Sequence, residues 1–200
     1  MDKYYKSISQ FLIDIDSINE SDRELYEYAL KVLFRSLTNV IIAAVVGIIF
    51  GMIKECFCFL AVFIVLRKFT GGLHLEKYVH CLLCSTIMLL LSLTTIKFLE
   101  NVNYNSFLWF VIVMLISLMI LAVLAPCENH NKPLTHKEKK FYKLASLLFC
   151  AVCLVLMIVL KSMDAYNYLY AIGTALFFVT ILLIIGHSKE HKFKKYKNRT

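Results

Sequence analysis

The apolar positions of the chain fall into long, nearly uninterrupted stretches that are separated by short polar segments. Five of these stretches contain 17 to 20 residues each and cover residues 37–53, 79–96, 107–125, 144–160 and 166–185. A helix of roughly 20 residues crosses the ~30 Å hydrocarbon core of a bilayer. The pattern therefore predicts an all-α polytopic membrane protein.

A sixth apolar stretch, residues 56–66, contains only 11 residues. It follows the first stretch after Lys54 and Glu55, so we expect the two segments to form a tight helical hairpin. Eleven helical residues rise only about 16 Å. This sixth segment must therefore extend into its flanking residues, or it is partly re-entrant and is covered by protein or water where it stops.

The first 36 residues follow a different, amphipathic pattern. Apolar side chains recur there at helical spacing, which leaves the opposite face polar, and they are Tyr4, Tyr5, Ile8, Phe11, Leu12, Ile15 and Ile18. We expect cytoplasmic or interfacial helices, packed on the protein or offering a docking surface to an amphipathic partner. The whole chain, 1–200, is then one membrane-embedded domain with N-terminal helices (1–36), a transmembrane region (37–185) and a basic tail (186–200).

Composition and charge support this interpretation. Hydrophobic residues make up 60% of the chain and the net charge is +8, whereas soluble domains are about 45–50% apolar. With six crossings, 19 of the 22 Lys and Arg residues lie on one side, and only Lys54, Lys97 and Lys161 lie on the other. The positive-inside rule then places both termini in the cytoplasm. The basic residues are divided among four segments at a membrane surface, so we expect contact with the lipid bilayer and no nucleic-acid binding.

The candidate chemistry is concentrated in residues 67–85, RKFTGGLHLEKYVHCLLCS. His80 and Cys84 are four apart and share a helical face, whereas His74 and Cys81 are two turns apart, so pairing them requires a bend. Cys81 and Cys84 also form a C-x-x-C motif, which is found in redox and metal sites. A structural metal site of this kind needs a second pair of ligands, and no second C-x-x-C occurs in this segment, so we expect no metal. The residues alone leave the choice of pair open.

This segment resembles the active-site region of a known family. The run Arg67-x3-Gly71-Gly72-x-His74-x6-Cys81-x3-Ser85 is similar to the active-site region of the accessory gene regulator B (AgrB) family. Members of this family are membrane peptidases of bacterial peptide quorum sensing. A second similar run follows the fourth long hydrophobic segment of the family and here reads Ala125-Pro126-x2-Asn129-x-Asn131-Lys132-Pro133. Length, hydrophobic segments and the basic tail agree as well, so the resemblance covers nearly the whole chain.

The resemblance implies a cysteine endopeptidase of the bacterial cell membrane in which His74 and Cys81 are catalytic. It implies supporting roles for Arg67, Gly71, Gly72 and Ser85, and binding of the substrate tail by basic residues of the following loop, here Lys132, Lys137, Lys139 and Lys140. The implied substrate is an AgrD-type propeptide, which is cleaved through a Cys81 thioester and closed to a thiolactone or lactone. No cofactor is implied, and a homodimer is a further expectation.

Two other functions remain open at this point. A membrane thiol oxidoreductase would use both Cys81 and Cys84 and would form a reversible disulfide. A non-catalytic scaffold or transporter would need no reactive thiol, so its activity would survive treatment with iodoacetamide.

Overall fold

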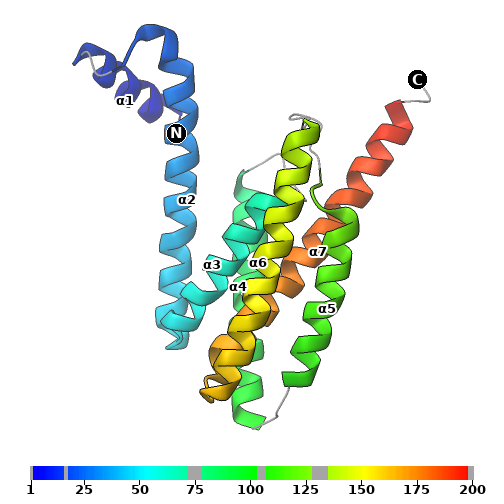
Figure 1. The fold of residues 1–200 in the computed structure, drawn as a ribbon. Helices are drawn as coiled ribbons and strands as arrows, with labels where there is room; N and C mark the ends of the chain where they lie inside the picture. The colour runs from blue at the N-terminus through cyan, green and yellow to red at the C-terminus, as the bar shows by residue number, and fades with distance from the viewer. Residues whose placement is uncertain (1, 16–17, 72–77, 103–106, 128–134, 198–200) are drawn as a thin grey trace. The chain divides into compact units, whose positions relative to one another are not determined.

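The computed structural model of the chain is built from helices (Figure 1) and describes residues 2–15, 18–71, 78–102, 107–127 and 135–197. In chain order its elements are α1 (Asp2–Asp14), the 3-10 helix η1 (Glu20–Asp22), α2 (Arg23–Phe50), α3 (Ile53–Thr70), α4 (Tyr78–Val102), α5 (Phe107–Leu124), α6 (His136–Ser162) and α7 (Tyr166–Lys197). Every regular element in these residues is helical, which confirms the predicted all-α polytopic fold.

Five helical stretches in the described residues are long and apolar enough to cross a membrane. They are Glu20–Phe50, Val79–Asn101, Phe107–Leu124, His136–Ser162 and Tyr166–Lys189, and they correspond to the five long apolar stretches of the sequence. The sixth hydrophobic segment, the short one, lies in α3 and is not among these candidates. The physical reason is that α3 carries four charged residues near its ends, namely Lys54, Glu55, Arg67 and Lys68.

The short apolar segment lies within α3, a helix of 18 residues. At 1.5 Å per residue this helix is about 27 Å long, so the segment extends into its flanks, which is the first of the two alternatives. One face of the helix is buried, with Cys56, Phe59 and Leu66 almost completely covered, whereas Phe57 and Ile64 are exposed. Because α3 packs against α4, α6 and α7, protein rather than lipid covers much of its surface.

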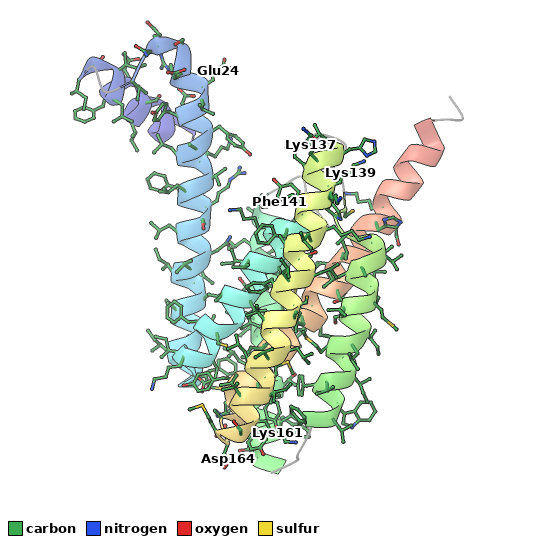
Figure 2. All side chains as sticks on the ribbon, viewed as in Figure 1. Glu24, Lys137, Lys139, Phe141, Lys161 and Asp164 are labelled. Carbon is green, nitrogen blue, oxygen red and sulfur yellow. The ribbon has the colours of Figure 1, made fainter. Side chains whose placement is uncertain are left out.

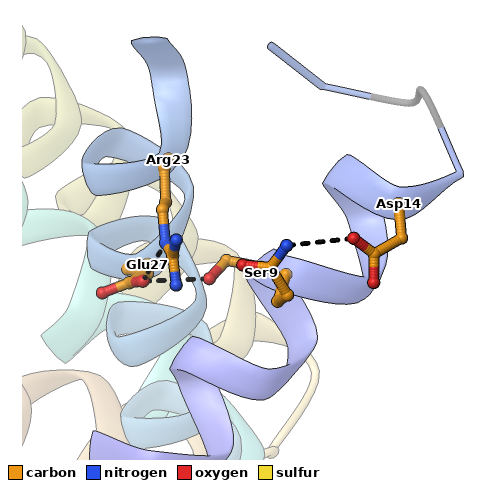
Figure 3. Close-up of polar contacts among 5 residues, drawn as sticks. Ser9, Asp14, Arg23 and Glu27 are labelled. Atoms are coloured by element: carbon orange, nitrogen blue, oxygen red, sulfur yellow. Dashed lines mark hydrogen bonds and ion pairs between the residues drawn. The ribbon is translucent and has the colours of Figure 1, made fainter. Parts of the chain in front are cut away.

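The chain divides into two compact units, Met1–Val45 and Val46–Thr200. In the first unit, polar contacts join α1 to the start of α2 (Figure 3): the Ser9 hydroxyl donates to Oε1 of Glu27 at 3.0 Å, and Nε of Arg23 donates to the same oxygen at 3.1 Å. Helix α2 then continues without a break past residue 36, where the N-terminal helices were expected to end. No glycine or proline occurs between residues 18 and 46, so nothing in the sequence stops this helix.

In the second unit, α7 is the central helix. In its most apolar stretch 72% of the residues are buried, against 11–22% in the other four spanning candidates. It packs against α3, α4, α5 and α6. A Cβ atom at Gly173 would collide with the Phe110 ring of α5, and the hydroxyls of Ser92 and Thr174 form a buried hydrogen bond of 2.6 Å between α4 and α7. Close packing and one polar contact therefore fix α7 against two neighbours.

Candidate active site

The two segments singled out in the sequence meet at one end of the second unit. Figure 1 shows the end of α3, the start of α4, the end of α5 and the start of α6 at the same end, because consecutive helices run in alternating directions. Phe69 near the end of α3 packs against Tyr142 near the start of α6, with 6.2 Å between the ring centroids. Lys161 and Asp164 lie at the opposite end (Figure 2). The fold thus makes one polar region from residues that are far apart in the sequence.

Arg67 lies in the last turn of α3 and faces the cysteines of α4. Its Nη1 atom is buried, and its guanidinium carbon lies 6.0 Å from the centroid of the Phe63 ring. Burial lowers the pKa of Arg67, and the nearby thiols of Cys81 and Cys84 act on it in the opposite direction. A cation beside a thiol favours the thiolate, which is the nucleophilic form of cysteine. The predicted supporting residue and the predicted nucleophile are therefore neighbours.

Cys81, Cys84 and Ser85 lie in the first two turns of α4 and are all half-buried. Cys81 and Ser85 are four apart and share a face of the helix. The competing histidine, His80, is exposed, and in the described part of the chain no hydrogen bond joins it to Cys84. All seven cysteines are free thiols.

Gly71 ends α3 in a conformation that favours glycine. Its φ is +69°, and its N–H donates to the Arg67 carbonyl at 3.1 Å. The backbone of Cys127, just after α5, lies against it: the Cys127 N–H donates to the Thr70 carbonyl at 2.9 Å, and Gly71 and Cys127 form an isolated parallel β-bridge. A Cβ atom at Gly71 would collide with the Cys127 carbonyl oxygen. Only glycine fits this junction without strain.

The start of α6 places three of the predicted tail-binding lysines at the same end. Thr135 and Glu138 form a capping box in which each side chain accepts from the other's backbone N–H. This cap begins the helix just before Lys137, Lys139 and Lys140, which lie in its first two turns. Figure 2 labels Lys137 and Lys139 at this end of the helix. Lys137 and Lys140 are exposed and Lys139 is half-buried. Near the Arg67 end of the unit there is thus a positive surface that an acidic peptide could approach.

Three of the predicted residues, Gly72, His74 and Lys132, lie outside the described residues. Within the described part of the chain, no group of three or more His, Cys, Asp or Glu side chains could hold a metal ion. Sequence reasoning missed the contact of Cys127 with Gly71. The similar run beginning at Ala125 marked the segment, but no pattern in it indicated that its backbone would pair with the end of α3.

The fold and this region define a class: a polytopic helical membrane protein with thiols and a guanidinium at one end of its helices. Comparison with known proteins narrows the class. Residues 5–185 match the family accessory gene regulator B, so the chain belongs to that family. It is 28% identical over 187 residues to an AgrB-like protein of Clostridium beijerinckii, covering 92% of this chain and 87% of the relative. An AgrB-like protein of Clostridium perfringens is 27% identical over 153 residues, 74% of this chain and 72% of the relative.

No solved structure matches the chain. Membership of the accessory gene regulator B family supports a part in the processing of quorum-sensing peptides at a membrane.

Proposed function

We propose that this chain is a membrane cysteine endopeptidase that removes the C-terminal tail of an AgrD-type propeptide and promotes ring closure of the signal peptide. The observation that carries this proposal is the placement of Arg67 at the end of α3 and Cys81 at the start of α4, at the same end of the unit where α6 and its lysines begin. A half-buried thiol beside a cation has the surroundings of reactive cysteines. Family membership supplies the class of substrate.

In the proposed reaction His74 accepts the proton of Cys81, and the thiolate attacks the carbonyl carbon of the peptide bond at the end of the signal core. A bond forms between Sγ and that carbon, the carbon–nitrogen bond breaks, and His74 returns the proton to the departing amine. The acidic tail leaves, and the core remains on Cys81 as a thioester. Arg67 stabilises the thiolate before the attack.

A side chain of the core then attacks the thioester. A core cysteine gives a thiolactone by exchange of one thioester for another, and a core serine gives a lactone; in both cases Cys81 leaves with its proton restored. Thioester exchange is nearly neutral in free energy, but water would hydrolyse the intermediate. A half-buried sulfur limits the access of water, and attachment of the core to the enzyme raises the effective concentration of the attacking group.

The α6 lysines support binding of the acidic tail. Lys137 and Lys140 are exposed and lie in the first two turns of α6, and Figure 2 shows Lys137 at the end of the unit where α6 begins. Attraction between exposed charges is long-ranged but screened by salt. We therefore assign these lysines to capture of the substrate rather than to the chemical step. The proposed membrane orientation, with this end in the cytoplasm, takes all six hydrophobic segments, α3 included, to cross the membrane, which is the arrangement that gives the charge asymmetry of the sequence.

The chemical step is tested with the full chain in proteoliposomes and a tagged AgrD-type propeptide. Cys81→Ala and His74→Ala are each expected to reduce tail release by at least about 1,000-fold, whereas Cys84→Ala should leave it nearly unchanged. Brief incubation of the unchanged chain should also trap a hydroxylamine-sensitive adduct of the core on Cys81. Normal tail release by Cys81→Ala would overturn the proposal. Equal loss in Cys84→Ala, with a reversible disulfide, would favour the oxidoreductase instead.

Substrate capture is tested separately by charge reversal. The combined variant Lys137→Glu/Lys140→Glu is expected to raise the KM for the propeptide about five- to tenfold at low salt, with little change in kcat. The control is Lys161→Glu at the opposite end of α6, whose KM should stay near that of the unchanged chain. Equal effects of the two changes would contradict an assignment of tail binding to the start of α6.

A further inference from the structure

The contact between Gly71 and Cys127 links the end of α3 to a part of the chain that is distant in sequence. Residues 125–127 follow the end of α5, and their backbone lies against the last residues of α3. One hydrogen bond, from the Cys127 N–H to the Thr70 carbonyl, joins them at 2.9 Å. Thr70 is completely buried and Ala125 nearly so. The contact is thus an interior one.

We propose that the Ala125–Cys127 segment is a positioning element of the candidate active site, which acts through its backbone by holding the Arg67–Gly71 turn against the cysteines of α4. Arg67 and Gly71 share one helical turn, since the Gly71 N–H donates to the Arg67 carbonyl. A displacement of Gly71 therefore moves the Arg67 side chain relative to Cys81. As far as catalysis is concerned, this inference rests on the proposed endopeptidase function.

The contact depends on main-chain atoms on both sides. On one side are the N–H and carbonyl of Cys127, and on the other the Thr70 carbonyl and the space left by the missing Cβ of Gly71. The Cys127 thiol is not needed for any of these. The proposal therefore separates two kinds of substitution: those that keep the backbone geometry are tolerated, and those that change it are not.

The chain provides a matched control for the glycine. Gly51, between α2 and α3, has the same φ of +69° as Gly71, but nothing lies within 4 Å of a Cβ built there. An alanine at either position meets the same backbone strain. Only at Gly71 does it also collide with the Cys127 carbonyl oxygen. The difference between the two alanine variants thus isolates the contact with residues 125–127.

The first readout needs no substrate: the rate at which iodoacetamide alkylates Cys81, followed by mass spectrometry across a range of pH. In Gly71→Ala the alkylation of Cys81 is expected to slow about tenfold at each pH, because the guanidinium of Arg67 moves away from the sulfur. Gly51→Ala and Cys127→Ala should keep the original profile. Continued protection of Cys150 from alkylation shows that each variant is folded.

The second readout is tail release from the AgrD-type propeptide. Gly71→Ala is expected to slow it about 10- to 100-fold, as small misplacements of catalytic groups do. Cys127→Gly, which keeps the N–H and carbonyl but loosens the backbone, should show both changes to a smaller extent, and Cys127→Ala should show neither. If Gly71→Ala fails to fold, the comparison of Cys127→Gly with Cys127→Ala tests whether the backbone of residues 125–127 has the positioning role.

Two results would overturn the positioning role. One is an alkylation profile in Gly71→Ala that equals that of Gly51→Ala. The other is a loss in Cys127→Ala as large as in Cys127→Gly, because the thiol rather than the backbone would then be responsible. If the unchanged chain does not release the tail at all, the proposed function fails, but the alkylation profiles still test the contact.

Discussion

Two C-x-x-C pairs occur in this chain, and they have opposite surroundings. Cys81 and Cys84 lie at the start of α4, half-buried, with the charge of Arg67 beside them. Cys150 and Cys153 lie in the middle of α6 and have no exposed surface. Cys153 is close to another cysteine, Cys58 of α3. The sequence spacing is identical in the two pairs, but only one has a cation and access to solvent.

The comparison shows that reactivity here comes from position in the fold and not from the motif. A thiol that is buried among apolar side chains stays protonated and behaves as a small hydrophobic group. A thiol beside a guanidinium at a helix start has a counter-charge for its thiolate. The α6 pair thus serves packing between α3 and α6, and the α4 pair contains the proposed nucleophile.

The largest expected effect concerns alkylation of the unchanged protein. In the folded chain, iodoacetamide should modify Cys81 at least about 1,000-fold faster than Cys150 or Cys153, because alkylation requires an accessible thiolate. Peptide mapping by mass spectrometry after a timed reaction measures the ratio. In denaturant the ratio should fall close to one. Comparable rates in the folded protein would remove the distinction between the two pairs.

A smaller effect is expected when the cation is removed. Arg67→Gln should slow both Cys81 alkylation and tail release about 10- to 100-fold at neutral pH, because the thiolate loses its counter-charge, and Arg67→Lys should retain part of the rate. The matched control is Lys68→Gln, which removes the adjacent but exposed cation of α3 and should change neither. An equal loss in both variants would point to the net charge of this surface rather than to Arg67 itself.

The smallest effect is on stability. Here we expect the larger change at the buried α6 pair and the smaller change at the α4 pair, the reverse of the order for alkylation. Cys150→Ala should lower the free energy of unfolding in detergent micelles by about 1 kcal/mol, because it leaves a small cavity in a fully packed site. Cys84→Ala, at a half-buried position, should cost less than half as much. Thermal unfolding followed by circular dichroism gives both values. A larger loss at Cys84 would mean that the α4 pair is also structural.

Much of the fold could be predicted from the apolar pattern, because long apolar stretches have few alternatives to spanning helices. The five long helices were found in this way. Two features needed the structure. The short segment 56–66 left two alternatives open, and the structure takes the one in which the segment extends into its flanks, as an 18-residue helix. The N-terminal helices were expected to end at residue 36, but α2 runs on into the first span because no glycine or proline interrupts residues 18–46.

The candidate site was predicted in its members but not in its arrangement. Arg67 and Cys81 were selected by resemblance, and their proximity is a result of the fold. The spacing of residues does not predict the Gly71–Cys127 contact. Two short backbone segments pair there only because of where the ends of α3 and α5 lie in the fold. His74 lies outside the described residues, so its role stays a prediction.

The sequence by itself determined that this protein is helical and membrane-embedded, where its long apolar helices lie, and which residues are available for chemistry. Hydrophobic length and charge asymmetry are properties of the chain that packing does not alter. The tertiary structure alone decided which C-x-x-C pair lies near the Arg67 side chain, which helix is central, and which backbone segment contacts the end of α3. Each of these depends on contacts between residues that are distant in sequence, and such contacts exist only after the helices have packed.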